Sequence, residues 1–497
     1  MPAVDRDGGR GVPGGTGIEP ASEAALAPEA AVPGGRLAIV RATPVLVGLA
    51  MFAMALFVPG VLNDADTFWH IKAGEWMIAY GAVPHTDPFS YTRAGAPWVA
   101  HEWLAEVAFA LAFRAAGWGG VVALTALAVG AAFFQLARHL GRWLPVPVVL
   151  LLCLLTASCV APGMLARPHV LALPFFETWV AGLFIARARG GAPSFWLLPV
   201  MCIWANLHGG YMLGLMLVLP LGLEALLDAP ADWRGTVPRW GGFLLGAVAA
   251  AAVTPHGLAG LLFPFQLVGL SELSMIVEWR PTDFSTLQPL ELVLVVGLYV
   301  ALTRGARLPP VRLLILLGLL HLGLTHTRHQ ALVGVILPLL LAGPIAAALP
   351  ALRPDRGGAR WAAWGLGGAS GLVVLRLLLP AAPGGKNPVP AAAVAHVPPA
   401  LATQPVFNEY SFGGYLIYAG IRPFIDGRAD LYGPAFMRAY DAATSPNLAV
   451  LEDLFRTYGV RWTLLPPGNP AVQLLDLMPH WCRLYSDEVA VVHAQSC

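Results

Sequence analysis

Long apolar runs recur along most of the chain, and short polar, proline-rich or arginine-rich segments separate them. A helix that crosses a bilayer needs about 20 apolar residues, and the pattern predicts about 11 such helices. The two runs between 194 and 228 are shorter and also fit a re-entrant hairpin. We expect spans near residues 42–62, 118–138, 146–164, 169–187, 194–208, 210–228, 240–256, 289–303, 311–327, 330–349 and 361–380.

Arginines mark alternate connections between these runs. Arg36 and Arg41 precede the first run, and further arginines fall in every second connection after it. Because basic residues concentrate in cytoplasmic loops, this pattern predicts a cytoplasmic N-terminus and an outer location for the region after residue 380. The arginines of the predicted inner connections are Arg138, Arg142, Arg187, Arg189, Arg234, Arg239, Arg304, Arg307, Arg312, Arg353, Arg356 and Arg360.

The predicted outer connections have a different composition. Charged and imidazole side chains near a membrane are costly unless they line a cavity or have partners. Topology alone does not explain acids, bases and amides together on one side, so they predict a polar functional site at the outer face. The residues concerned are Asp64, Asp66, His70, His85, His101, Glu102, Arg167, His169, Asn206, His208, His256, Glu278, Arg280, Arg328 and His329.

The first outer connection, residues 63–117, is long and contains two helical stretches. Apolar residues in 67–80 recur at helical spacing, and their aromatic content suits a helix at the membrane interface. A second helix is expected to begin near residue 101, after a turn-rich segment. The residues of the first apolar face are Trp69, Ala73, Trp76, Met77 and Tyr80.

Two aspartates open this connection in the sequence NDADTFWHIKAGEW. Asp66 fits the cap of the helix that is expected from Thr67. A carboxylate at this place also fits a general base or, through Asp64 and Asp66 together, the ligands of a divalent ion such as Mg²⁺ or Mn²⁺.

The two ends of the chain differ from its middle. Residues 1–37 are rich in Gly, Pro and Ala and are expected to be a disordered cytoplasmic segment, followed by a transmembrane domain over 38–380 and a linker over 381–399. Residues 400–497 predict a small extracytoplasmic α/β domain. Its expected strands lie in PVFNEY, RPFIDGRADLY, RWTLLPP and VAVVHA, and its expected helices in GGYLIYAG, AVLEDLFRTYG and AVQLLDLMP.

Composition supports a membrane protein. Of the 497 residues, 57% are hydrophobic and 12% are charged, and the mean hydropathy is +0.66. An ordinary soluble domain has about twice this charged fraction. The net charge of +1 argues neither for nor against a nucleic-acid partner, but the sequence contains no basic run that would bind one, so none is expected. Cys482 and Cys497 fit a disulfide if their domain faces an oxidising compartment.

Several motifs together resemble the membrane-embedded GT-C glycosyltransferases, a superfamily that includes protein O-mannosyltransferases, aminoarabinose transferases and the catalytic subunit of oligosaccharyltransferase. The resemblance covers most of the chain from about residue 40. A group of bacterial membrane proteins described as glycosyltransferases is especially similar. The motifs are DADTFWHIKAGEWMIAYGAVPHTDPFSYTRAGAPWVAHEWLAE, WANLHGGYMLG, EWRP and VFNEYSFGGYLIYAGIRPFIDGRADLYG.

The resemblance implies a sugar donor linked to a polyprenyl phosphate and a reaction at the outer face of the bacterial cytoplasmic membrane. In such enzymes a carboxylate of the first outer loop deprotonates the acceptor hydroxyl, and a single displacement inverts the anomeric carbon. Asp66 matches that carboxylate best because Phe68 and Trp69 follow it. Asp64 is a second catalytic candidate or a metal ligand.

Two arginines are rival ligands of the donor phosphate. Arg167 and Arg328 both lie at predicted outer ends of spans, and a guanidinium suits a phosphate leaving group. The alternative for Arg167 is a snorkelling arginine, and the alternative for Asn206 and His208 is a structural turn. The remaining candidates for the outer cavity are His70, His101, Glu102, His169, Asn206, His208, Glu278, Arg280 and His329.

The tail motif DGRAD, with Asp426, Arg428 and Asp430, favours a structural or acceptor-binding role over catalysis.

A non-enzymatic transporter or assembly factor for lipid-linked saccharides is the alternative function, and a lipid-linked glycan polymerase or ligase is a third. A transporter would favour internal repeats and a polar site at mid-membrane, whereas the polar residues here gather at one predicted face.

Overall fold

The computed structural model describes residues 34–268, 277–305, 307–349, 361–383 and 389–495. Most of the predicted disordered N-terminus, the middle of the predicted linker, and Cys497 lie outside the described residues. The pairing of Cys482 with Cys497 therefore stays a prediction.

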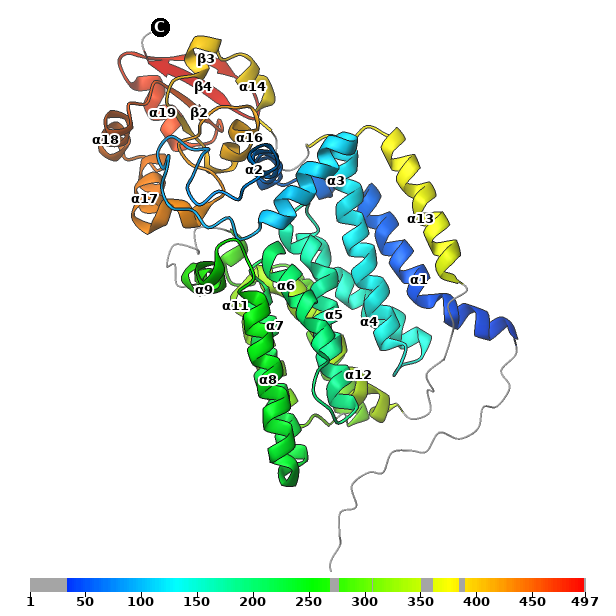
Figure 1. The fold of residues 1–497 in the computed structure, drawn as a ribbon. Helices are drawn as coiled ribbons and strands as arrows, with labels where there is room; N and C mark the ends of the chain where they lie inside the picture. The colour runs from blue at the N-terminus through cyan, green and yellow to red at the C-terminus, as the bar shows by residue number, and fades with distance from the viewer. Residues whose placement is uncertain (1–33, 269–276, 306, 350–360, 384–388, 496–497) are drawn as a thin grey trace, which may run out of the picture.

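A bundle of long helices forms one body, and a small mixed domain sits on one of its ends (Figure 1). Each predicted span coincides with a helix of this bundle, and α9 (Gly257–Val268) is an additional helix that the apolar pattern did not predict. The bundle helices are α1 (Gly34–Phe57), α3 (Trp103–Leu140), α4 (Val146–Val160), α5 (Pro168–Ala188), α6 (Leu198–Leu207), α7 (Tyr211–Asp228), α8 (Trp233–Ala251), α10 (Pro289–Arg304), α11 (Pro310–Thr325), α12 (Gln330–Ala348) and α13 (Trp361–Leu378).

Five described helical segments are long and apolar enough to cross a membrane, which is the signature of a multi-pass membrane protein. Several other helices are apolar but shorter, so the count of about 11 crossings stays a prediction. The five segments are Trp103–Leu140, Val146–Gly163, Pro168–Ala188, Tyr211–Asp228 and Thr327–Ala348.

Small residues allow the first bundle helices to approach closely. A Cβ added to Gly48 of α1 would lie 2.8 Å from Phe134 Cβ, and one added to Gly130 of α3 would lie 2.8 Å from Phe52 Cβ. Such close crossings are typical of helices that pack within a membrane. Helix α3 also breaks at Ala116 and Gly117, so the predicted boundary between outer loop and span coincides with a kink.

The C-terminal domain contains a four-stranded sheet in the order β1-β2-β4-β3. Strands β1 and β2 are parallel, and β4 is antiparallel to both β2 and β3. The strands are β1 (Val406–Asn408), β2 (Trp462–Leu465), β3 (Trp481–Ser486) and β4 (Val491–Gln495). The helices are α14 (Ala391–Ala395), α15 (Pro399–Ala402), α16 (Gly413–Tyr418), α17 (Ala429–Thr444), α18 (Leu448–Tyr458) and α19 (Pro470–Leu477).

One predicted strand is wrong. RPFIDGRADLY forms no strand: its first part is irregular and α17 begins at Ala429. The side chain of Asn408 explains this, because its Oδ1 accepts from the Phe424 amide at 2.8 Å and its Nδ2 donates to the Ile425 carbonyl at 2.8 Å. These bonds take the place of a strand ladder. Strand β3, which the pattern did not predict, completes the sheet.

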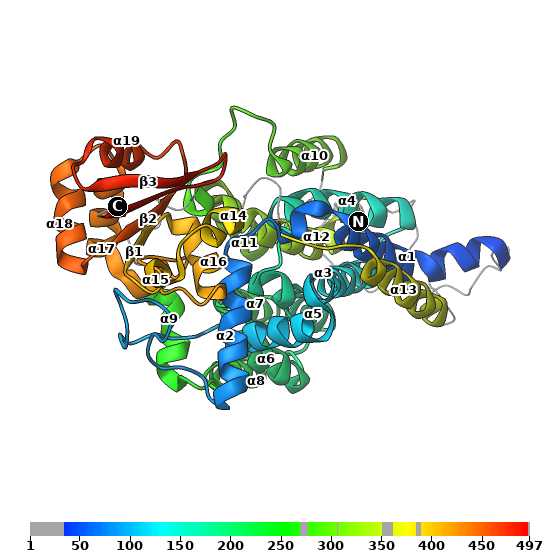
Figure 2. The ribbon, with the colours of Figure 1, turned by 90° about the horizontal axis from the view of Figure 1, so that it is seen from above.

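Helix α2 (Asp66–Tyr80) lies across the top of the bundle beside α16 (Figure 2). Trp69, Ala73 and Met77 are buried in one apolar cluster with residues of the C-terminal domain. The expectation that this face rests on the membrane interface is therefore wrong for these three residues. Their apolar period fits a protein neighbour as well as a lipid one, and the C-terminal domain covers them.

The segment between α2 and α3 is tied to the C-terminal domain by several hydrogen bonds. Thr92 Oγ1 donates to the Phe424 carbonyl at 2.6 Å, and Arg93 Nη2 donates to the Tyr432 carbonyl at 2.7 Å. The first loop and the C-terminal domain consequently form one wall over the end of the bundle at which α1 ends and α5 begins. This end is called the domain end below.

Candidate active site

The two aspartates begin helix α2, but their roles differ from the expectation. The Asp66 amide donates to Asp64 Oδ1 at 2.7 Å. Asp64, and not Asp66, therefore satisfies an amide at the helix start, where free N–H groups require acceptors. The cap role expected for Asp66 is wrong, and its carboxylate is available for other contacts.

Arg167 joins three carboxylates at the domain end. Its Nε lies 2.6 Å from Asp64 Oδ2, its Nη1 donates to Glu278 Oε1 at 2.5 Å, and its Nη2 pairs with Asp66 Oδ2. Each nitrogen of the guanidinium thus faces a different acid. The structure therefore brings these four residues together, although the first and the last of them, at positions 64 and 278, are more than 200 residues apart in the sequence.

Backbone contacts hold Arg167 against the first loop. The Ala166 amide donates to the Val61 carbonyl at 2.8 Å, and Thr67 Oγ1 donates to the Ala166 carbonyl at 3.0 Å. Arg167 is also the residue before Pro168, the first residue of α5. The start of α5 and the start of α2 are therefore fixed relative to each other.

Burial and neighbouring charges divide the acids of this group. Burial raises the pKa of Asp66 to about 6, because Arg167 compensates only part of the lost solvation and Asp64 adds repulsion. Burial also acts to raise the pKa of Glu278, but Arg167 and then Arg328 outweigh it and hold that pKa below its ordinary value. Asp66 is accordingly the acid of the group that is tuned toward neutral pH.

The C-terminal domain closes against Asp66. A Cβ added to Gly427 would lie 1.9 Å from Asp66 Oδ1, so any larger residue there would require the Asp66 carboxylate to move. The Tyr410 hydroxyl donates to the Gly427 carbonyl at 3.0 Å and fixes this segment. Burial raises the pKa of Asp430, a few residues on, to about 6 despite the opposing charge of Arg428.

Glu102 forms a second polar group with two histidines. His101 Nε2 and His208 Nε2 each lie 3.7 Å from Glu102 Oε1. Burial raises the pKa of Glu102 to about 8, although Arg328 and Arg167 act in the opposite direction. Burial lowers the pKa of His101 to about 4 and that of His208 well below its ordinary value. At neutral pH this group consists of a protonated acid and neutral imidazoles.

Arg328 lies close enough to Glu278 for its charge to act on that acid, and His329 follows it in the chain. The Arg328 guanidinium stacks over the Trp279 ring at 4.3 Å from its centre. Within the described ranges, no hydrogen bond or carboxylate pair engages the Arg328 side chain. His326 Nδ1 bonds to the Trp279 carbonyl at 2.8 Å, and the His329 ring packs edge-on to Trp279. The rival phosphate ligands thus differ: every guanidinium nitrogen of Arg167 pairs with an acid, whereas no acid among the described residues pairs with Arg328.

Other predicted candidates have structural partners. Asn206 is buried, accepts from Trp103 Nε1 at 2.6 Å and donates to two backbone carbonyls, so its amide is satisfied. His70 Nδ1 lies 3.4 Å from Glu106 Oε1, and both side chains are buried. His169 Nε2 bonds to the Gly163 carbonyl at 2.8 Å. Arg280 is exposed.

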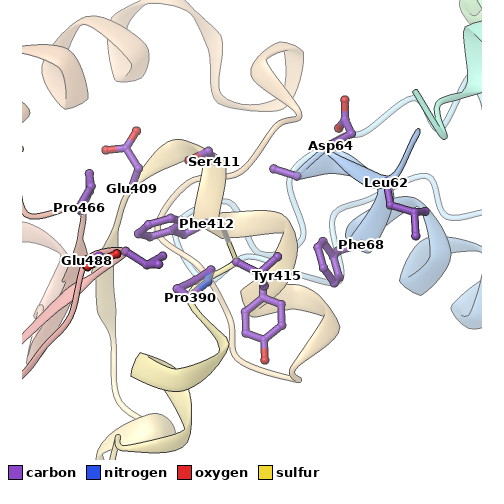
Figure 3. Close-up of a pocket in the computed structure, with 13 residues that line it drawn as sticks. Leu62, Asp64, Phe68, Pro390, Glu409, Ser411, Phe412, Tyr415, Pro466 and Glu488 are labelled. Carbon is purple, nitrogen blue, oxygen red and sulfur yellow. The ribbon is translucent and has the colours of Figure 1, made fainter. Parts of the chain in front are cut away.

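A cavity of about 260 Å³ separates the first loop from the C-terminal domain (Figure 3). Asp64 and Phe68 line it from the loop side. From the domain side it is lined by two acids, Glu409 and Glu488, and by aromatic residues that include Tyr415. The cavity therefore offers acidic and aromatic surfaces next to the start of α2.

The acids around Arg167 do not fit a divalent metal ion. Such an ion requires several free oxygen ligands, whereas Asp64, Asp66 and Glu278 all contact Arg167. In the part of the chain that the structure describes, no group of three or more His, Cys, Asp or Glu residues is arranged to hold a metal.

No family model matches the chain, and no curated protein matches it in sequence. Its structure aligns with that of the Archaeoglobus fulgidus oligosaccharyltransferase in the apo form, with a TM-score of 0.50 and 11% identity, over 86% of this chain and 69% of that one. The chain has a GT-C-type fold. At this identity the likeness establishes the fold alone.

Two further solved structures are similar at lower scores. AglB from Archaeoglobus fulgidus, in complex with an inhibitory peptide and a dolichol-phosphate, aligns with a TM-score of 0.46 and 11% identity over 86% of this chain and 69% of that one. ArnT from Cupriavidus metallidurans, bound to undecaprenyl phosphate, aligns with a TM-score of 0.47 and 13% identity over 91% of this chain and 98% of that one.

Sequence reasoning did not identify three residues next to this site. Tyr410 and Gly427 approach Asp66 from the C-terminal domain, and Trp279 supports Arg328. Trp279 lies in the EWRP motif and Gly427 in DGRAD, so both motifs contained a signal. A glycine between two charged residues fits a turn, and it also fits the close approach of another group.

Proposed function

We propose that this chain is an integral membrane glycosyltransferase that moves a sugar from a polyprenyl-phosphate donor to an acceptor hydroxyl. The reaction takes place at the domain end, on the outer face of the bacterial cytoplasmic membrane, with the N-terminus in the cytoplasm. The observation that carries the proposal is the position of Asp66 at the domain end, where its half-buried carboxylate pairs with Arg167 and burial raises its pKa to about 6. The shared fold with an oligosaccharyltransferase supports the same class of reaction.

In this mechanism Asp66 is the general base. It removes the proton of the acceptor hydroxyl while that oxygen forms a bond to the anomeric carbon. The bond from this carbon to the phosphate oxygen breaks, and the phosphate leaves with the electron pair. A base with a pKa near the working pH suits this proton transfer. Attack opposite the leaving group inverts the anomeric carbon.

Arg328 is the better ligand for the leaving phosphate. Arg167 has each of its nitrogens engaged by an acid, whereas Arg328 makes a stacking contact that leaves its donors available. A guanidinium can hold two phosphate oxygens at once. His208 and the protonated Glu102 lie on the same side and can donate hydrogen bonds to the donor.

The cavity between the first loop and the C-terminal domain is the proposed approach for the acceptor. Its aromatic residues Phe68 and Tyr415 offer stacking surfaces, and Asp64 at its edge is two residues before the base. The C-terminal domain would then form the acceptor side of the site, and the bundle with Arg328 the donor side.

The test is the change Asp66→Asn in the purified full-length chain. We expect donor turnover to fall by about 10²–10⁴-fold, since the amide cannot accept the proton. Asp453→Asn, on an exposed part of α18, is the matched control and should leave turnover unchanged. If turnover survives Asp66→Asn while saccharide export fails in cells, the chain is a transporter or assembly factor and the catalytic proposal is wrong.

A further inference from the structure

Three acids converge on one cation in this site. Asp64 and Asp66 come from the start of α2, and Glu278 comes from a 3₁₀ turn (Val277–Trp279) much later in the chain. Arg167 contacts each of them through a different nitrogen. Carboxylates brought together from distant segments repel one another unless a positive charge lies between them, and that charge is commonly a divalent ion.

We propose that the Arg167 guanidinium is the resident cation of this acidic site and acts in place of a divalent metal ion. The inference rests on the proposed function for its catalytic meaning. Arg167 is then a positioning residue: it holds Asp66 in one orientation beside Gly427 and balances the charge of Asp64 and Glu278. The reaction would require no added divalent ion.

The geometry around Arg167 favours this assignment over a mobile side chain. The hydrogen bond from the Ala166 amide to the Val61 carbonyl fixes the backbone next to Arg167. The guanidinium is planar, so its N–H donors point in fixed directions. The pairs with Asp64 and Glu278 measure 2.6 and 2.5 Å. A metal at this position would have to displace a side chain that has ion pairs on every nitrogen.

Arg328 provides the matched comparison. It is a second arginine whose charge acts on Glu278, but its guanidinium stacks on Trp279 and bridges none of the three acids among the described residues. Removal of Arg328 takes away one positive charge from the same region. Only removal of Arg167 frees the three carboxylates for another cation.

The test measures Mn²⁺ binding to the full-length chain in detergent by electron paramagnetic resonance, a readout that does not depend on turnover. After removal of metal with EDTA, wild type and Arg328→Ala are expected to bind no stoichiometric Mn²⁺. Arg167→Ala is expected to gain about one Mn²⁺ per chain, because three carboxylate ligands become free. The double change Arg167→Ala with Asp64→Asn should lose most of that binding.

The outcomes separate this inference from the proposed function. A stoichiometric Mn²⁺ in wild type that Asp64→Asn removes would show a metal site and overturn the inference. A folded Arg167→Ala variant, with unchanged thermal unfolding, that gains no Mn²⁺ would overturn it as well. Donor turnover of wild type that is unchanged by EDTA supports it, whereas absence of any turnover bears only on the proposed function.

Discussion

Arg428 and Arg167 each contact more than one carboxylate, and they differ in what surrounds the pairs. Arg428 contacts Asp426 through Nε and Nη2 at 2.8 and 2.7 Å and Asp87 through Nη1 at 2.7 Å. Its side chain is 1% exposed, and the ring of Trp98 lies 4.8 Å away. Arg167 makes a similar set of pairs, but it is 21% exposed and lies beside a cavity wall.

The pKa values of Asp426 and Asp66, one acid from each group, shift in opposite directions. Asp426 also accepts from the Tyr432 hydroxyl at 2.7 Å, and Arg428 outweighs burial and lowers the pKa of Asp426. Asp66 has Arg167 and a repelling neighbour in Asp64, and burial raises its pKa to about 6. Asp426 thus has a hydrogen-bond donor in addition to its arginine, whereas Asp66 has a second acid as its neighbour. This difference fits a structural role for Asp426 and, in the proposed mechanism, a role as base for Asp66.

The largest expected effect is on the structural group. Arg428→Met would leave Asp426 and Asp87 buried without their cation, so the free energy of unfolding should fall by about 3–5 kcal/mol. Thermal unfolding followed by tryptophan fluorescence measures it. The control is Arg456→Met, whose pair with Asp453 is exposed and should contribute less than about 0.5 kcal/mol. Equal effects of the two changes would mean that Arg428 does not anchor the domain.

A smaller effect should separate function from stability at the Arg167 group. In Gly427→Ala the new methyl group would meet Asp66 Oδ1 at 1.9 Å and displace the carboxylate. A displacement of about 1 Å at a reacting group can lower turnover by about 10²-fold. Gly468→Ala, in the same domain with open space around its Cβ position, is the control. Turnover equal to wild type in Gly427→Ala would show that this contact does not position the base.

The sequence predicted the acids, the arginines and their common face, but not which of them pair. Apolar runs define helices locally, and the arginine pattern orders their ends. The contact between Arg167 and Glu278 joins residues 111 positions apart, and no local period encodes such a pairing. The choice between Arg167 and Arg328 as phosphate ligand depended on that contact.

Two errors have a related cause. The apolar face of Trp69, Ala73 and Met77 fits a lipid surface and a protein surface equally. Apolar periodicity indicates that a helix face is covered, but it does not indicate whether lipid or protein covers it. The segment around Asp426 has strand-like composition, but Asn408 bonds to its backbone and prevents a ladder. Both depend on how the C-terminal domain docks, which is tertiary information.

The smallest effect is a difference in pH dependence between the two groups. Asp66 must be ionised to accept a proton, so turnover should decline below its pKa of about 6 and be about tenfold lower at about pH 5. Its pKa exceeds the ordinary value of 3.8, so the folded chain binds more protons than the unfolded chain between these values. The contribution of Asp66 to stability therefore decreases as pH rises through this window.

Asp426 should show the reverse. Its pKa is below 3.8, so its contribution to stability is present above that value and is lost only as pH falls below it. Turnover and thermal unfolding, measured together between about pH 4 and 7, should thus diverge: acid should lower turnover before it lowers stability. If turnover and stability decline together, loss of the fold accounts for the pH profile, and Asp66 is not the group that titrates.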